Sequence, residues 1–408
     1  MQKANKLSPL SALYIALFLS TFVDNMILFV ANAIIKNNPN LNQDYYLPFV
    51  QAMFLANFII FSPWVGRFAD KHAKANVLII GIIIKSIGVL LFFLGMDPAF
   101  NYSIIGMGAV VYSPAKYGIL PFLTNNETEL LQSNSDLEIY TIIAILTGSV
   151  TGGFIADHSI PLALVVCFLL YSCSILVTLL IPKDAGNPSI TFRHSVREFF
   201  ADVNQLCSEN QSRYCFVGTG SFWMTSSVLR VIMFSWAPLA IGSTVLVSLP
   251  GLGSFTLDLT QNSSISLIFS FTGIGIVMGA LVAPKIISIK TYYKSVWFGF
   301  AMALTVLSFV IVRNFYIAIF LLLLIGTLGG IFSVPLNATL QQIGHNTIGS
   351  GKTIAIQNFI ENNFMFMGVG AYTLAQKGGI LANTSICTMG LILLAMILFM
   401  YTQSKTKI

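Results

Sequence analysis

Charge is the scarcest property of this chain. Only 9% of its 408 residues are charged, whereas 56% are hydrophobic, and a soluble domain carries about 25% charged residues. So few charges cannot cover the surface of a water-soluble protein of this length. The net charge of +6 is not accompanied by an aromatic and basic stripe or by a nucleic-acid-binding motif, so it does not indicate a nucleic-acid partner.

Cysteine and histidine are also rare, with five and four residues. The cysteines lack metal-binding spacing, and we interpret them as packing residues rather than as ligands or disulfides. None of the histidines has the spacing to an aspartate that common membrane acyltransferases use. Because no serine elbow, metal cluster or phosphate loop is present either, we expect no enzyme, no cofactor and no metal.

Long apolar runs are what the chain has in abundance. Segments of about 20 residues recur from end to end, and each is long enough to cross a bilayer as a helix. The first run is too long for a cleavable signal peptide. We predict an all-α membrane protein with twelve transmembrane helices, at 11–35, 47–66, 76–96, 102–122, 138–156, 160–182, 214–241, 264–285, 292–312, 315–341, 353–376 and 380–402.

The basic residues predict the orientation of these helices. If both termini are cytoplasmic, three of the 21 basic residues lie outside (Lys36, Arg313, Lys377), three lie within spans, and the other fifteen are cytoplasmic. Such a bias follows the positive-inside rule. We therefore expect a multi-pass membrane protein with both termini in the cytoplasm.

A polar segment divides the chain into halves. We predict an N-terminal six-helix bundle at 1–182, a cytoplasmic linker at 183–213 and a C-terminal six-helix bundle at 214–408. Apolar residues at helical spacing within the linker indicate an amphipathic helix on the inner membrane surface, although a solvated tether is an equal alternative. The strings GMGAVVYSPAKYGIL at 106–120 and GTLGGIFSVPLNATL at 326–340 suggest the parallel repeat of a two-bundle transporter.

A carboxylate lies in the middle of the first predicted span. Asp24 would cost about 2.5–3.5 kcal/mol on insertion scales unless it faces a wet cavity or a partner charge. Arg230 lies at a similar predicted depth on the seventh span, so we hypothesise a cross-bundle pair between the two. Lys116 follows Pro114 in the fourth span, where a cation could meet a phosphate. We interpret Lys85 as snorkelling toward the cytoplasm or pairing with Glu138.

The eleventh span carries a polar stripe. Its members recur at helical spacing and therefore share one face, which on a membrane helix looks toward protein or water. Lining a cavity and bonding to a neighbouring helix are both open, and we favour lining. The residues are Gln357, Asn358, Glu361, Asn362 and Asn363.

The turn between the second and third spans contains Gly66, Asp70 and Lys74. It resembles the loop motif of the major facilitator superfamily, although Ala73 stands where a second glycine is usual. The resemblance implies a conformational latch, in which Asp70 docks at the start of the eleventh span, near 350–353.

Two glycine patterns predict close helix crossing. The fifth span carries Gly148 and Gly152, and the eighth carries Gly275 and Gly279, in each case at the spacing that lets helices approach. The first pattern is similar to the superfamily's antiporter motif without its proline. We interpret all four residues as helix-packing positions.

Several strings together resemble one branch of that superfamily, the bacterial lysophospholipid transporters. They are STFVDNMILF at 20–29, PWVGRFAD at 63–70, YSPAKYGIL at 112–120, AILTGSVTGGFIAD at 144–157, Leu229-Arg230, VPLNATLQ at 334–341 and AIQNFIEN at 355–362. The segment 242–263 departs from the family by its length.

The resemblance implies transport of lysophospholipids from the outer to the inner leaflet of the bacterial inner membrane by alternating access, for reacylation by a partner acyltransferase. The partners it implies are this substrate and membrane lipids, for a protein that acts as a monomer. The residues expected to bind substrate or gate its path are Asp24, Asn25, Lys116, Tyr117, Arg230, Gln357, Asn358 and Glu361. A proton-coupled exporter of drugs or other amphiphiles is the alternative, with Asp24 as the proton carrier.

Overall fold

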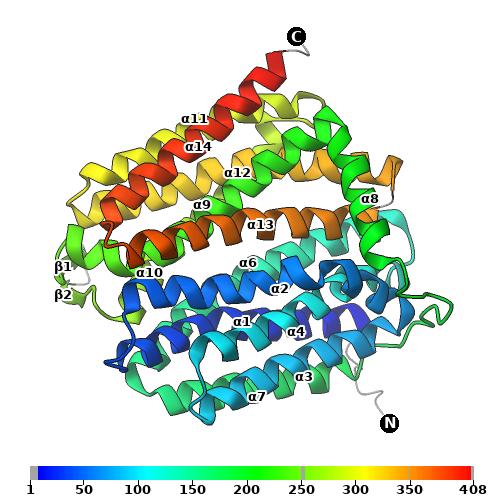
Figure 1. Cartoon of the computed structure of the whole chain (residues 1–408), viewed down its shortest axis with the longest axis horizontal. Helices are drawn as coiled ribbons and strands as arrows, with labels where there is room; N and C mark the ends of the chain where they lie inside the picture. The colour runs from blue at the N-terminus through cyan, green and yellow to red at the C-terminus, as the bar shows by residue number, and fades with distance from the viewer. Residues whose placement is uncertain (1–7, 250–252, 349, 406–408) are drawn as a thin grey trace. The chain divides into compact units, whose positions relative to one another are not determined.

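The computed structural model describes residues 8–249, 253–348 and 350–405. Nearly all of them are helical, as the apolar runs predict (Figure 1). The first half of the chain forms α1 (Pro9–Lys36), α2 (Gln43–Lys71), α3 (Lys74–Phe93), α4 (Pro98–Gly118), α5 (Leu120–Leu123), α6 (Glu127–His158), α7 (Ile160–Thr178) and α8 (Ser195–Ser208).

The second half forms six long helices and a short sheet. The elements are α9 (Asn210–Ala240), β1 (Thr244–Leu249), β2 (Gly253–Asp258), α10 (Asn262–Ile286), η1 (Ile289–Ser295), α11 (Val296–Ser308), η2 (Phe309–Ile311), α12 (Phe315–Asn346), α13 (Ser350–Lys377) and α14 (Ala382–Lys405). Because η1, α11 and η2 follow one another without a break, they count as one span, 289–311.

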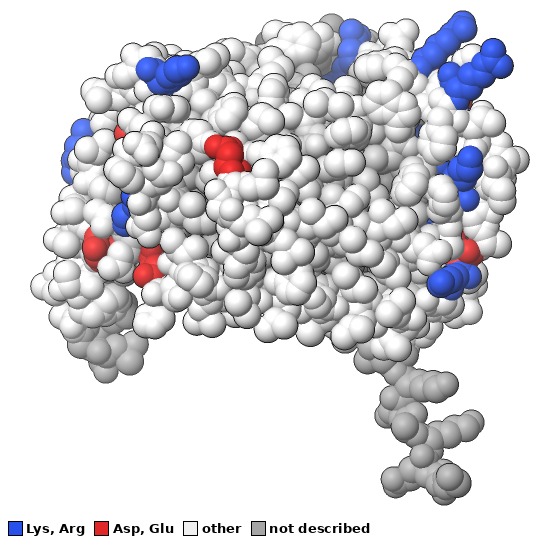
Figure 2. Space-filling model, turned by 60° about the horizontal axis from the view of Figure 1, so that its bottom comes forward, with Lys and Arg blue, Asp and Glu red and all other residues white. Residues whose placement is uncertain are grey.

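All twelve predicted spans overlap a long helix, so the prediction of an all-α membrane protein is confirmed. Within the described residues, nine helices are apolar and long enough to cross a membrane by length and composition. The other three long helices, α4, α9 and α13, carry Lys116, Arg230 and the polar stripe. Figure 2 shows a face on which charged side chains are few and broad areas carry none.

The chain divides into two compact units. Unit 1 contains the described residues up to Ala31 together with Met53–Ala201, and unit 2 contains Asn32–Ala52 together with the described residues from Asp202 onward. The predicted limits differ in that they place all of 1–182 in one bundle. Two contacts hold 32–52 to unit 2, since Asn32 Nδ2 donates to Asn262 Oδ1 at 2.5 Å and Lys36 Nζ donates to the carbonyl of Thr260 at 2.8 Å.

The long segment 242–263 folds into an antiparallel hairpin rather than a plain loop. Val247 pairs with Phe255 in its ladder. Past the second strand, Thr260 donates to Asp258 through its backbone N–H at 2.8 Å and its hydroxyl at 2.7 Å. These bonds hold the pKa of the Asp258 carboxyl below its ordinary value, and they close the turn into α10.

Helices α3 and α4 of unit 1 approach each other closely. A Cβ built on Gly108 would lie 2.5 Å from the carbonyl oxygen of Gly81 and 2.6 Å from Cγ of Lys85. Such distances leave no room for a side chain. The stem of Lys85 therefore lies in the space that Gly108 leaves open, and this contact directs the ammonium group toward α1.

Candidate functional site

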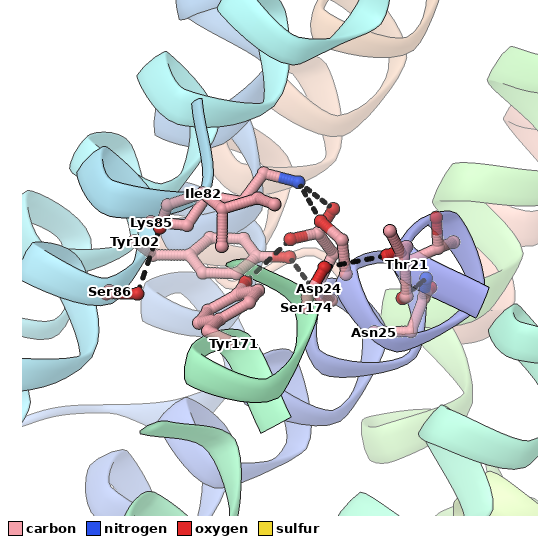
Figure 3. A network of polar contacts seen from close by, with 11 residues as sticks. Thr21, Asp24, Asn25, Ile82, Lys85, Ser86, Tyr102, Tyr171 and Ser174 are labelled. Carbon is pink, nitrogen blue, oxygen red and sulfur yellow. Dashed lines mark hydrogen bonds and ion pairs between the residues drawn. The ribbon is translucent and has the colours of Figure 1, made fainter. Parts of the chain in front are cut away.

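Asp24 lies at the centre of a polar network inside unit 1 (Figure 3). Lys85 Nζ on α3 is 2.6 Å from Asp24 Oδ2 on α1. Tyr171 on α7 donates its hydroxyl to Asp24 Oδ1, also at 2.6 Å. The hydroxyl of Tyr102 on α4 contacts the backbone carbonyl of Asp24 at 3.5 Å. Side chains of α3 and α7 therefore meet at the carboxylate of α1, and α4 contacts the backbone of the same residue.

The ammonium of Lys85 is satisfied on several sides. It donates to Ser20 Oγ at 2.9 Å, one helical turn before Asp24. It also lies 4.8 Å from the centre of the Tyr112 ring, a favourable position for a cation above an aromatic face. A buried charge is tolerated when it is paired and hydrogen-bonded, and the sequence supplies both conditions here.

The interpretation of Lys85 as a snorkelling residue is wrong. Its residue exposure is 1%, and its ammonium group bonds to Asp24 and Ser20. The side chain of Glu138, its other expected partner, lies outside the described residues. The sequence predicts the partner of Asp24 on the repeat-related helix, whereas unit 1 provides one from α3. The pair of Asp24 with Arg230 of unit 2 stays a prediction.

The two members of the ion pair differ in access. The side chain of Asp24 is 17% exposed and that of Lys85 only 2%. Lys85 is thus enclosed by protein, while Asp24 keeps an accessible edge. An accessible carboxylate with a fixed counter-ion can accept a further donor without leaving its own cation uncompensated.

The other unit 1 candidates lie on the same helices. Asn25, next to Asp24, donates its side-chain amide to the carbonyl of Thr21 at 2.9 Å. On α4, Lys116 Nζ lies 4.6 Å from the centre of the Tyr117 ring, two residues after Pro114. Both Lys116 and Tyr117 are part-buried.

A second polar cluster joins α12 and α13 in unit 2. The side-chain amide of Gln357 donates to Asn337 Oδ1 and to Glu361 Oε1, each at 2.8 Å. Gln357 and Glu361 are 8% and 7% exposed. The carbonyl of Asn358 accepts from Asn362 Nδ2 at 2.7 Å. The sequence favours cavity lining for this stripe, whereas Gln357 bonds to the neighbouring helix α12, as the alternative predicts.

The residues of the predicted latch differ in exposure and in contacts. Nothing lies within 4 Å of a Cβ built on Gly66, and the Asp70 side chain is 66% exposed. Lys74 Nζ is 4.0 Å from Asp70 but 3.0 Å from Asp184 of the linker. Lys74 is therefore held by the linker within unit 1, and docking of Asp70 near 350–353 stays a prediction.

The four glycines of the packing patterns lie against helix backbones. In unit 1, a Cβ on Gly148 would come within 2.2 Å of the carbonyl of Phe22, and one on Gly152 within 2.7 Å of Met26 Cα, so α6 packs on α1 beside Asp24. In unit 2, Gly275 and Gly279 meet α12 in the same way, with carbonyl oxygens of that helix 2.2 Å and 2.1 Å from the added Cβ atoms.

Comparison with known proteins gives a consistent result. Residues 13–368 match the family model described as Major Facilitator Superfamily. The chain is 37% identical to "Lysophospholipid transporter LplT" of Serratia proteamaculans, over 90% of this chain and 88% of that protein. The protein of that name from Yersinia enterocolitica is 36% identical, over 90% and 87%.

Among solved structures, the chain is similar in fold to a POT family transporter in complex with 5-aminolevulinic acid. The TM-score is 0.75, the alignment covers 97% of this chain and 96% of that one, and the sequence identity is 10%. At this identity the likeness concerns the fold alone.

Proposed function

The chain belongs to the major facilitator superfamily, and from this membership we propose that it transports lysophospholipids by alternating access. The observation that carries the proposal is the 37% identity to a lysophospholipid transporter over 90% of the chain. The direction we propose is from the outer to the inner leaflet, where a partner acyltransferase restores the second chain.

The chemistry of a lysophospholipid suits the residues of unit 1. Such a lipid has one acyl chain, a phosphate and, in the ethanolamine form, an ammonium group. The accessible edge of Asp24 provides a carboxylate for the ammonium, and Lys116 provides a compact cation for the phosphate. The abundance of phenylalanine, with 33 residues, suits a carrier whose path must accept an acyl chain.

The remaining site assignments are part of the same proposal. We assign Asn25, Tyr117 and Arg230 to the head-group path, and we assign Gln357, Asn358 and Glu361 to the gating of that path in unit 2. The latch of Gly66, Asp70 and Lys74 would favour one conformation of the carrier. These assignments rest on sequence resemblance together with the position of each residue in its own unit.

The alternative, a proton-coupled exporter, requires Asp24 to take up and release a proton. Both carboxylate oxygens already accept, one from Lys85 and one from Tyr171. A proton on Asp24 would leave the enclosed Lys85 ammonium without its counter-charge, which is costly in a buried site. This contact favours a fixed ion pair over a proton carrier.

Uptake of labelled lysophosphatidylethanolamine tests the proposal. The protein is expressed in bacteria that lack another importer of this lipid, and label is followed into diacyl lipid with and without a proton or sodium gradient. We expect uptake with the wild type and a loss of at least about tenfold in D24N, because a single lost charged contact is worth about 1.4 kcal/mol or more.

The matched control is Lys377→Met, a change at the exposed end of α13 that should leave uptake intact. Uptake at the same rate in cells without the protein would defeat the lysophospholipid proposal. Export of amphiphiles driven by a proton gradient, without lysolipid uptake, would support the alternative.

We further propose that this multi-pass membrane protein resides in a bacterial inner membrane as a monomer, with both termini in the cytoplasm. The support is the placement of fifteen of 21 basic residues on the side of the termini. Alkaline phosphatase fused after Lys36 should be active, and the same enzyme fused after Lys74 should be inactive. The opposite pattern would reverse the orientation.

A further inference from the structure

Helix α8 leaves part of its apolar surface uncovered. Phe192, Val196 and Phe200 are 38%, 40% and 48% exposed. Val196 and Phe200 are one turn apart on α8 and therefore share a face. Phe192 lies four residues before Val196, in the bend that precedes the helix. We call these three residues the stripe. On the adjoining side of α8, Ser195 and Leu206 are 2% and 1% exposed. One side of the helix is therefore buried, and its apolar surface extends from this buried side onto the exposed side.

Two basic residues border the stripe. Arg193 and Arg197 each follow a stripe residue by one position, and both are exposed. Arg193 lies in the turn before α8. At about 100° per residue, Arg197 lies on the side of the stripe away from the buried residues, followed by the exposed Ala201. Around the helix, the buried side is followed by the apolar stripe, then by a basic residue and then by the polar side. A helix that lies in a membrane interface has its surfaces in this order.

Contacts with α2 fix the depth of this stripe. Arg67 Nη1 donates to the carbonyl of Thr191 at 2.7 Å, and Arg67 also forms an ion pair with Glu198. Lys71 Nζ lies 5.2 Å from the centre of the Phe192 ring. Arg67 and Lys71 belong to the end of a helix long and apolar enough to span the membrane, so the start of α8 is held at the membrane boundary.

The direction of α8 agrees with this position. Figure 1 shows α8 running crosswise to α2, as expected of a helix that follows the bilayer surface while α2 crosses it. A helix in this attitude presents one long side to the lipid.

We propose that Phe192, Val196 and Phe200 insert among the lipids of the adjoining leaflet, and that Arg193 and Arg197 bind anionic head groups there. The occupant of the surface is a lipid layer rather than a protein, because apolar side chains with a basic border match anionic lipid. The proposal goes beyond the transport function, since these lipids are contacted and not carried. Of the two alternatives that the sequence leaves open for the linker, the proposal takes the amphipathic helix on the membrane surface, because a solvated tether does not account for this stripe.

Brominated lipids provide the test. An added tryptophan at Phe200 (F200W) is compared with one at the next residue (A201W), which lies on the polar side, and the emission of the wild-type protein is subtracted from both. The full chain is reconstituted in vesicles of phosphatidylethanolamine with phosphatidylglycerol brominated on its acyl chains. Both positions are exposed, so the fold should survive, and size-exclusion profiles check this.

We expect the F200W signal to be quenched roughly twofold more than the A201W signal and to be blue-shifted, since only the former reaches acyl chains. Adding R193Q and R197Q to F200W should reduce the quenching, and replacing the anionic lipid with brominated phosphatidylcholine should do the same. Equal quenching of F200W and A201W would overturn the proposal. The proposal would also be overturned if the F200W tryptophan remained exposed to water in both kinds of vesicle and became shielded only when a soluble protein was added.

Discussion

Replacing Lys85 with methionine tests the central ion pair most directly. The substitution keeps an unbranched side chain of similar length in the space beside Gly108, but it removes the ammonium group. Of the contacts seen among the described residues, Asp24 would then keep the Tyr171 hydroxyl but lose its counter-charge. Since Lys85 is 1% exposed, water cannot easily take its place.

The expected loss follows from the geometry. Two unit charges 2.6 Å apart attract each other by about 6 kcal/mol at an effective dielectric constant of about 20. Desolvation of both groups offsets part of this attraction, and removal of one partner of a buried pair typically costs about 3–5 kcal/mol. We expect K85M to lose an amount in that range and D24N to lose a comparable amount. The double variant should recover most of the loss, because no uncompensated charge remains.

The assay is thermal unfolding of the purified protein in detergent, followed by the fraction that remains monodisperse. Lys352→Met is the matched control, because Lys352 Nζ is 2.9 Å from Asp202 in a pair of similar length, yet its side chain is 61% exposed. Such a surface pair contributes about 0–1 kcal/mol after solvent screening. The wild type, K85M, D24N and the double variant form a double-mutant cycle, and K352M is the exposed reference outside it.

Two results would refute the reasoning. If K85M were as mild as K352M, the Asp24–Lys85 pair would not be a buried ion pair in the membrane protein. If the double variant were less stable than either single variant, the effect would come from lost packing and not from a stranded charge. Uptake measured on the double variant separates folding from transport, and we expect a stable protein that does not transport.

Three further predictions follow from single contacts. Gly148→Leu should prevent α6 from packing on α1, since even a Cβ there lies 2.2 Å from the carbonyl of Phe22, and the loss will be visible as low yield of monodisperse protein. Tyr171→Phe removes one donor to Asp24 and should cost about 1.5–3 kcal/mol by the same unfolding assay, because the acceptor is charged; an unchanged midpoint would contradict this. The pKa of Asp258 is lowered in the fold, so its contribution to hairpin stability is fully present above the unfolded pKa of about 3.9. This contribution is lost as the pH falls through the lower pKa of the folded state. Over that pH range, hydrogen exchange of the hairpin should accelerate in the wild type but not in D258N.

The sequence predicts the helices well because a bilayer imposes one length and one polarity on each of them. The same constraint makes Asp24 conspicuous, so the central carboxylate is found without a structure. Pro114 and Pro335 also mark the repeat-related helices α4 and α12. All of these signals are local, and each can be read within about 20 consecutive residues.

The partners of Asp24 are not local. Lys85 and Tyr171 lie 61 and 147 residues away along the chain, and nothing in either segment specifies which helix each will face. The approach of α3 to α4 at Gly108 decides where the lysine points, and it depends on tertiary packing. The hairpin at 244–258 was missed for a different reason, since a short two-stranded sheet beside long helices leaves only a weak alternation in the sequence.

The separation between Asp24 and its counter-ion also has a consequence for biosynthesis. At about 5–20 residues per second, roughly 3–12 s pass between translation of Asp24 and translation of Lys85, which follows 61 residues later. During that interval α1 has left the ribosome with a carboxylate for which no cation of α3 yet exists. Membrane insertion of the first helix must therefore be completed cooperatively with that of the third, and a chain truncated before Lys85 should release α1 from the bilayer far more readily than one truncated after α7.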